Sequence, residues 1–124
     1  MKMINLFCSI GNDVDSFESI EFKNDAITYK SRGSLTAKTF SPSENLLNEI
    51  YQILNSNTLK NYIDPNIGIN PTPGERYYDT RDFFFLRVPS LNLEIKIYID
   101  SAQTESLCNL ISLFISIFQE AQKT

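Results

Sequence analysis

The chain contains no histidine, and only four of its 124 residues are glycine. Histidine is the side chain that titrates near neutral pH and the commonest protein ligand for transition metals. Its absence excludes Ser-His and Cys-His nucleophile pairs and an ordinary catalytic zinc site. The sequence also lacks a glycine-rich phosphate loop and a Gly-x-Ser-x-Gly elbow. We therefore expect no cofactor, no metal and no catalytic residues, and hence a protein that is not an enzyme.

Cysteine is scarce, since only Cys8 and Cys108 occur, a hundred residues apart. Two cysteines at this separation form no metal-binding pattern. Both have apolar neighbours, which predicts two reduced and buried side chains. A disulfide between them stays open, because the sequence does not give the distance between the first strand and the last helix.

Positive charge is in deficit, because 15 acidic residues outnumber 11 basic ones and the net charge is −4. Most surfaces of such a protein repel a phosphate backbone, so we expect no nucleic-acid partner and favour a basic protein partner. Apolar residues make up 42% and charged residues 21%, which is typical of a globular protein. The length fits a single domain over residues 1–124.

Long apolar runs are absent. The stretch 107–118 is too short to cross a bilayer, and Asn109, Ser112 and Ser116 interrupt it. Residues 1–10 are too short for a secretory signal and have no small-residue cleavage site. We therefore expect a soluble, cytoplasmic protein without a membrane partner.

The first forty residues show the alternation of strands. Residues 2–10 predict a strand, and residues 17–40 predict a three-stranded meander after a polar loop. Two turns set its register, a two-residue turn at 24–25 and a three-residue turn at 31–33 with Gly33 at positive φ. The predicted pairs are Phe22 with Ile27, Ile20 with Tyr29, Glu21 with Thr28, Tyr29 with Leu35, and Ile27 with Ala37.

Two amphipathic helices are predicted from capping residues and helical spacing. Ser41 caps the first, with Pro42 at its first position and Glu44 completing a capping box, and this helix ends near 55–57. Asp100 or Ser101 caps the second. The second helix is apolar over most of its circumference, so it must be heavily buried against the sheet or in a dimer.

Between the helices, residues 57–81 are irregular, with a short helix around 59–63 as an option, and residues 82–100 predict a hairpin. A turn at Pro89-Ser90 pairs Val88 with Leu91. The outer face of this hairpin then carries Phe83, Phe85, Arg87, Glu94, Lys96 and Tyr98. The order of strand, meander, helix, hairpin and helix predicts an α+β domain, with an antiparallel sheet of about six strands and the helices on one face.

Two acidic groups are candidate sites. Asn12, Asp13, Asp15 and Glu18 offer oxygen ligands for calcium, but the glycine and the terminal glutamate of a calcium loop are missing, so a solvated turn is favoured. Pairs drawn from Glu75, Asp79 and Asp82 could serve acid–base chemistry, although charges in loops are usually only solvated.

A protein-binding surface is the better supported candidate. Tyr, Phe and Arg are enriched at the centres of interfaces. The alternative is that residues 57–81 or the first strand cover Phe83 and Phe85 and make a second small core. The residues expected to bind a partner are Arg76, Tyr77, Tyr78, Asp79, Arg81, Asp82, Phe83, Phe85, Glu94 and Tyr98.

The order of elements over residues 17–122 resembles the class I type III secretion chaperones. In size, acidity, α+β composition and the lack of catalytic residues, the chain is also similar to immunity proteins of bacterial toxin systems, including contact-dependent inhibition. The second resemblance implies a stoichiometric protein that occludes a cognate, basic toxin. The first implies a dimeric chaperone that holds an effector segment.

Overall fold

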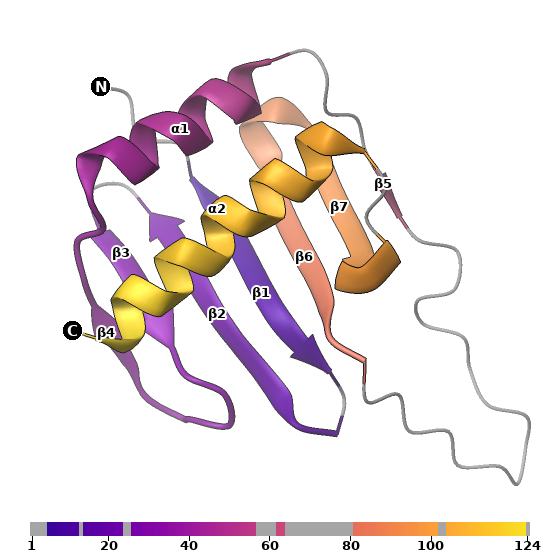
Figure 1. Ribbon diagram of the computed structural model, residues 1–124. Coiled ribbons are helices and arrows are strands. Elements are labelled where there is room, and N and C mark those ends of the chain that lie inside the picture. The colour runs from indigo at the N-terminus through magenta and orange to yellow at the C-terminus, as the bar shows by residue number, and fades with distance from the viewer. Residues whose placement is uncertain are drawn as a thin grey trace, which may run out of the picture.

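The computed structural model contains a seven-stranded sheet with two helices (Figure 1). It describes residues 5–12, 14–23, 26–56, 62–63, 81–101 and 104–123. The strands are β1 (Leu6–Asn12), β2 (Ser16–Lys23), β3 (Ala26–Lys30), β4 (Ala37–Thr39), β5 (Tyr62–Ile63), β6 (Phe83–Val88) and β7 (Leu93–Tyr98). The helices are α1 (Glu44–Asn55) and α2 (Glu105–Gln122), and the 3-10 turns are η1 (Pro89–Leu91) and η2 (Ile99–Ser101).

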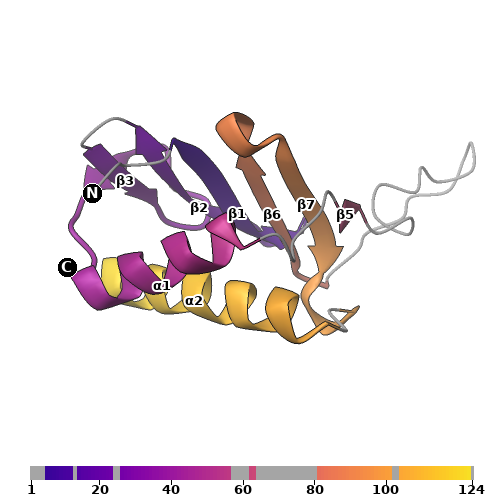
Figure 2. The same ribbon diagram turned by 90° about the horizontal axis from the view of Figure 1, so that it is seen from above.

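The strand order is β4-β3-β2-β1-β6-β7-β5, so the first strand of the chain is central. The meander lies on one side of β1 and the hairpin on the other, and only β5 runs parallel to its neighbour β7. Figure 2 shows both helices on the same side of the sheet. The predicted α+β fold is confirmed. Tyr62–Ile63 is extended, however, so the optional helix around 59–63 is wrong at its described end.

The core lies between the sheet and the helices. In β1 the side chains of Leu6, Cys8 and Ile10 are buried there, as the alternation predicts. α2 contributes seven buried residues, and its exposed positions include Asn109 and Ser112. The largest side chains that are almost completely buried are Phe22, Phe84, Phe114 and Phe118.

The register of the meander is confirmed in its first half and wrong in its second. Phe22 pairs with Ile27 as predicted, but Tyr29 pairs with Lys38 and not with Leu35. The β3–β4 connection is longer than a three-residue turn, and Leu35 within it is 96% exposed. Phe40 is buried instead, and its ring packs on Tyr29 at 6.3 Å between centroids. Phenylalanine buries more apolar area than leucine, which favours this register.

The β6–β7 hairpin has the predicted faces but a longer connection. Val88 pairs with Leu93 and not with Leu91, because η1 and Asn92 join the strands. Asn92 has a left-handed φ of 50°, a conformation that asparagine tolerates. The register differs from the prediction by two residues, and a shift by two keeps every side chain on its face.

The helix caps lie further along the chain than predicted. Ser43, and not Ser41, caps α1, and its hydroxyl accepts a hydrogen bond of 3.4 Å from the Leu46 amide. Thr104 caps α2 in the same way through Leu107 at 3.2 Å. Asp100, one of the two predicted caps, lies in the 3-10 turn that ends the hairpin.

The two cysteines have different environments. Cys8 is buried in β1, where burial and the nearby charge of Glu18 raise the pKa of its thiol. Cys108 is exposed on α2, so the prediction that it is buried is wrong. Both are free, and no disulfide joins them. Among the described helices, none has the length and apolar character needed to cross a membrane.

Gly11 allows two aromatic rings to meet at the end of β1. It pairs with Phe17 on one side and Phe83 on the other, and these rings contact edge to face at 5.2 Å. A Cβ at Gly11 would collide with the Ser16 carbonyl and lie 2.7 Å from the Phe17 Cα. These are backbone atoms, so no rotation of a side chain relieves the collision.

We therefore expect Gly11→Ala to lower the free energy of unfolding by more than about 1 kcal/mol. Urea denaturation followed by circular dichroism measures it. Gly33→Asn is the control, because Gly33 has a φ of 74° in open space and asparagine accepts this conformation. Equal stability of Gly11→Ala and the wild type would contradict the close packing.

Candidate functional site: the open face of the sheet

No described helix covers the second face of the sheet, which we call the open face. It consists of the outward-pointing residues of five neighbouring strands. Cross-strand pairing arranges them in rows, and the central row runs from Lys30 on β3 to Lys96 on β7. The open face carries Phe7, Ser9, Phe17, Ser19, Glu21, Lys23, Thr28, Lys30, Phe83, Phe85, Arg87, Glu94, Lys96 and Tyr98.

Aromatic rings gather on this face in two groups. Phe83 contacts Phe17 at 5.2 Å and Tyr98 at 6.5 Å, while Phe85 lies 6.2 Å from Phe7. Phe83 and Phe85 are half-buried, and Phe7 is 36% exposed. The alternation of the hairpin therefore placed these rings on the correct face.

Tyr98 departs from the expectation that the hairpin rings are exposed. It is only 4% exposed, and the Arg81 guanidinium lies 3.8 Å from the centre of its ring. An arginine over an aromatic face is an attractive cation–π contact. Tyr98 and Arg81 thus support the edge of the aromatic group, and Tyr98 offers little surface to a partner.

A hollow of about 490 Å³ opens on this face between the two aromatic groups. Ser9 and Ser19 pair across β1 and β2, and their short side chains leave space between the neighbouring rings. Loop residue Leu35 adds an almost fully exposed apolar side chain to its margin. The hollow is lined by Phe7, Ser9, Ser16, Phe17, Ser19, Lys30, Gly33, Ser34, Leu35, Phe83, Phe85 and Lys96.

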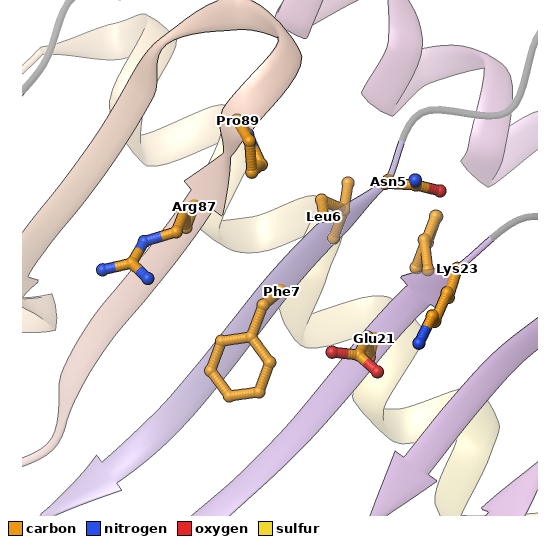
Figure 3. A pocket seen from close by; sticks show the side chains of 8 residues that line it. Asn5, Leu6, Phe7, Glu21, Lys23, Arg87 and Pro89 are labelled. Carbon is orange, nitrogen blue, oxygen red and sulfur yellow. The ribbon is translucent and has the colours of Figure 1, made fainter.

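A second hollow of about 390 Å³ lies beyond Phe7, toward the start of β1. Figure 3 looks onto the open face here, with the helices behind the strands. Phe7, Glu21 and Arg87 project from three neighbouring strands into this view. Phe7 lines both hollows and so stands between them.

The charge of the open face is opposite to that of the whole chain. Its described residues include four cations, Lys23, Lys30, Arg87 and Lys96, and two carboxylates, Glu21 and Glu94. Glu94 is bound to Arg87 at 3.5 Å. Among the described residues, no carboxylate forms an ion pair with Lys30 or Lys96, although Lys96 lies 5.5 Å from the Phe83 ring centre. The two lysines at the hollow therefore provide positive charge to an approaching molecule.

The predicted binding residues are only partly brought together. Arg76, Tyr77, Tyr78 and Asp79 lie outside the described residues, as does Glu75. Phe83, Phe85 and Glu94 lie on the open face as predicted. Whether residues 57–61 and 64–80 cover the rings is likewise outside the described part of the chain.

Asp82, at the end of the sheet, is held by Arg32 and Asn12. Its carboxylate accepts hydrogen bonds from Arg32 at 3.2 and 3.3 Å and from the Asn12 amide at 2.7 Å. Asn12 is buried, and its carbonyl oxygen also accepts from the Val14 and Asp15 amides. This network ties the β1–β2 turn, the β3–β4 loop and the start of β6 together. Asn12 thereby has a structural role.

The described residues of the acidic group Asn12, Asp13, Asp15 and Glu18 do not form a metal site. Within the residues that the structure covers, no group of three or more acidic or cysteine side chains could hold a metal ion. Asp13 lies outside them.

Sequence reasoning did not select Phe7, Ser9, Ser19, Lys30 or Leu35. The alternation of residues 2–10 already turns Phe7 and Ser9 away from the core. What the sequence lacked was the position of β1 between β2 and β6, which places these residues beside Phe85. No protein-family model, curated protein or solved structure matches the chain.

The Asp82 network predicts a pH-dependent stability. Burial raises the pKa of Asp82, but the hydrogen bonds and charge of Arg32 and the hydrogen bond from Asn12 outweigh it, so the pKa lies below its usual value. A depressed pKa stabilises the fold above the usual carboxyl pKa of about 4, and this stabilisation is lost as pH falls through the folded value. We expect a contribution below about 1 kcal/mol, because the pair is partly exposed.

Urea denaturation of the wild type and Asp82→Asn at pH 7 and near pH 2 tests this. The wild type should be more stable at neutral pH, and the difference should shrink at low pH. Asp100→Asn, which alters an exposed carboxyl in η2, is the control. A difference between wild type and Asp82→Asn that stays the same at both pH values would contradict the network's role.

Proposed function

We propose that the chain is a non-catalytic protein-binding domain and that its open face docks the partner. The observation that carries this proposal is the hollow of about 490 Å³ over the central strands of the sheet, which is lined by aromatic rings and by Lys30 of β3 and Lys96 of β7. Aromatic side chains beside a concavity are typical anchors of protein interfaces. Phe7 and Leu35 expose apolar surface next to it. Burying such surface on association is favourable.

The specific form of this proposal is an immunity protein that binds and occludes a cognate bacterial toxin. Its support is the resemblance in size, acidity and α+β composition, together with a sheet face that no described helix covers. Occlusion requires only tight, stoichiometric binding. Aromatic anchors slow the release of the partner, and charges on the rim speed its encounter.

The sign of the partner's charge was expected to be positive, from the net charge of −4. That expectation stays a prediction. Of the acidic residues expected to bind the partner, Asp82 is bound by Arg32 and Asn12, and Glu94 is bound by Arg87. The described open face therefore favours contact with carboxylates more than with cations.

The second candidate is a dimeric, chaperone-like protein that holds an effector segment. The observation that favours it is β4, an edge strand whose three residues are all exposed. An extended client segment can add to such an edge through main-chain hydrogen bonds.

Light scattering on the purified chain separates the two candidates. A concentration-independent monomer is expected for the immunity protein, because its binding surface is reserved for the toxin. A tight dimer would favour the chaperone-like protein and count against the first proposal.

Growth of cells that express a toxin tests the function. Where a large toxin reading frame adjoins the gene, co-expression of this chain should restore growth, and Phe85→Asp should not. We expect Phe85→Asp to weaken binding of that toxin by about 30-fold or more, as for an interface hot spot. Calorimetry measures the affinity, and circular dichroism checks that the variant folds.

Ser112→Asp is the matched control, because it adds the same charge at an exposed position of α2, on the other side of the sheet. It should restore growth fully. If Phe85→Asp does not fold, Phe85→Ser replaces it. A folded Phe85 variant with full affinity would remove the open face from the proposal, and a purely metabolic neighbouring gene would contradict toxin immunity.

A further inference from the structure

We infer that the hollow of the open face binds an extended protein segment in which carboxylate, apolar and carboxylate side chains occupy alternate positions. The inference rests on the proposed function and names the chemistry of the partner at that site. It follows from the order of residues across the sheet, the space above two serines, and the charges at both ends.

The central row of the open face has a symmetric chemistry. Register pairs place Lys30, Ser19, Ser9, Phe85 and Lys96 side by side on five successive strands. Positive charge thus stands at both ends of the row. Its middle is small and polar beside Phe85, and the rings of Phe7 and Phe83 also line the hollow. An apolar side chain fits between these rings, above the two serines.

The distance between the two lysines of the central row determines how far apart the carboxylates of the bound segment must be. Four inter-strand spacings of about 4.8 Å put the Cα atoms of Lys30 and Lys96 about 19 Å apart. In an extended segment, residues i and i+4 lie about 13 Å apart and point to the same side as i+2. Lysine side chains are long enough to lean inward over the remaining distance. A carboxylate at i and i+4 therefore meets the lysines, while an apolar side chain at i+2 enters the hollow.

Charge supports this occupant over a basic segment, and over a second copy of the chain that docks through its own open face. The described open face has four cations and two carboxylates, and one of these carboxylates is already bound to Arg87. No described carboxylate forms an ion pair with either lysine of the row. A basic segment would meet like charges at both ends, which costs affinity.

The test uses three blocked peptides and the full chain, observed by amide chemical shifts in NMR. The first is Gly-Glu-Ser-Phe-Ser-Glu-Gly, which has the proposed pattern. The second, Gly-Ser-Glu-Phe-Glu-Ser-Gly, has the same composition and charge with its carboxylates on the opposite side. The third carries lysine in place of glutamate in the first. We expect the first peptide to shift the Ser9, Ser19 and Phe85 amides and to bind at least about tenfold tighter than the others.

Variants of the protein locate the contact. The double variant Lys30→Glu/Lys96→Glu should bind the first peptide at least about tenfold more weakly than the wild type does. Added salt should weaken the binding of this peptide to the wild type. Lys123→Glu, an exposed charge reversal after α2, should leave it unchanged. Ser19→Leu, which fills the hollow, should also reduce binding.

The outcomes separate this inference from the proposed function. Equal binding of the two acidic peptides, preference for the lysine peptide, or no binding of any peptide would overturn the alternating acidic segment. None of these results alters the toxin assay with Phe85→Asp, which decides the proposed function independently. Shifts of the same amides with protein concentration, without peptide, would assign the hollow to a second copy and overturn the inference.

Discussion

The alternation of side chains along one central strand is the constraint on which the rest of the structure depends. β1 sends Leu6, Cys8 and Ile10 into the core and Phe7 and Ser9 outward. Because it lies between β2 and β6, the same alternation extends across both neighbours. A shift of one residue in β1 would expose its buried face and move Phe7 into the core. The covered face and the open face are therefore two consequences of one register.

The open face differs from the core in how its aromatic residues are held. Phe17 and Phe83 meet over Gly11, where the absent side chain leaves room, while Tyr98 is held under Arg81. In the centre of the sheet, the short side chains of Ser9 and Ser19 leave space between the rings, and this space is the hollow. Two carboxylates that were expected to face a partner are bound within the protein. Asp82 accepts a hydrogen bond from Asn12, and Glu94 forms an ion pair with Arg87. The protein is acidic as a whole, yet the described part of this face carries more positive than negative charge.

The errors in the predicted strand registers have a common cause, which is the length of the connections between strands. Faces were predicted correctly wherever the period of two was uninterrupted, as in β1, β2 and the β6–β7 hairpin. The β3–β4 register was predicted wrongly because a three-residue turn was assumed, which made Leu35 the apolar partner of Tyr29. The connection is longer, and the larger ring of Phe40 is buried instead. The caps at Ser43 and Thr104 were missed because several hydroxyl or acidic residues precede each helix, and any of them satisfies the local capping rule.

The sequence by itself determined the class of fold, the order of the elements apart from β5, and the faces of β1, β2 and the β6–β7 hairpin, because these depend on local periodicity. It also located Phe83 and Phe85 on the face of the hairpin that points away from the two helices. Only the tertiary structure decided that β1 lies between the meander and the hairpin. That placement brings Ser9, Ser19, Lys30, Phe85 and Lys96 into one row. Strand order depends on long-range packing between segments far apart in the chain, and no local pattern records it.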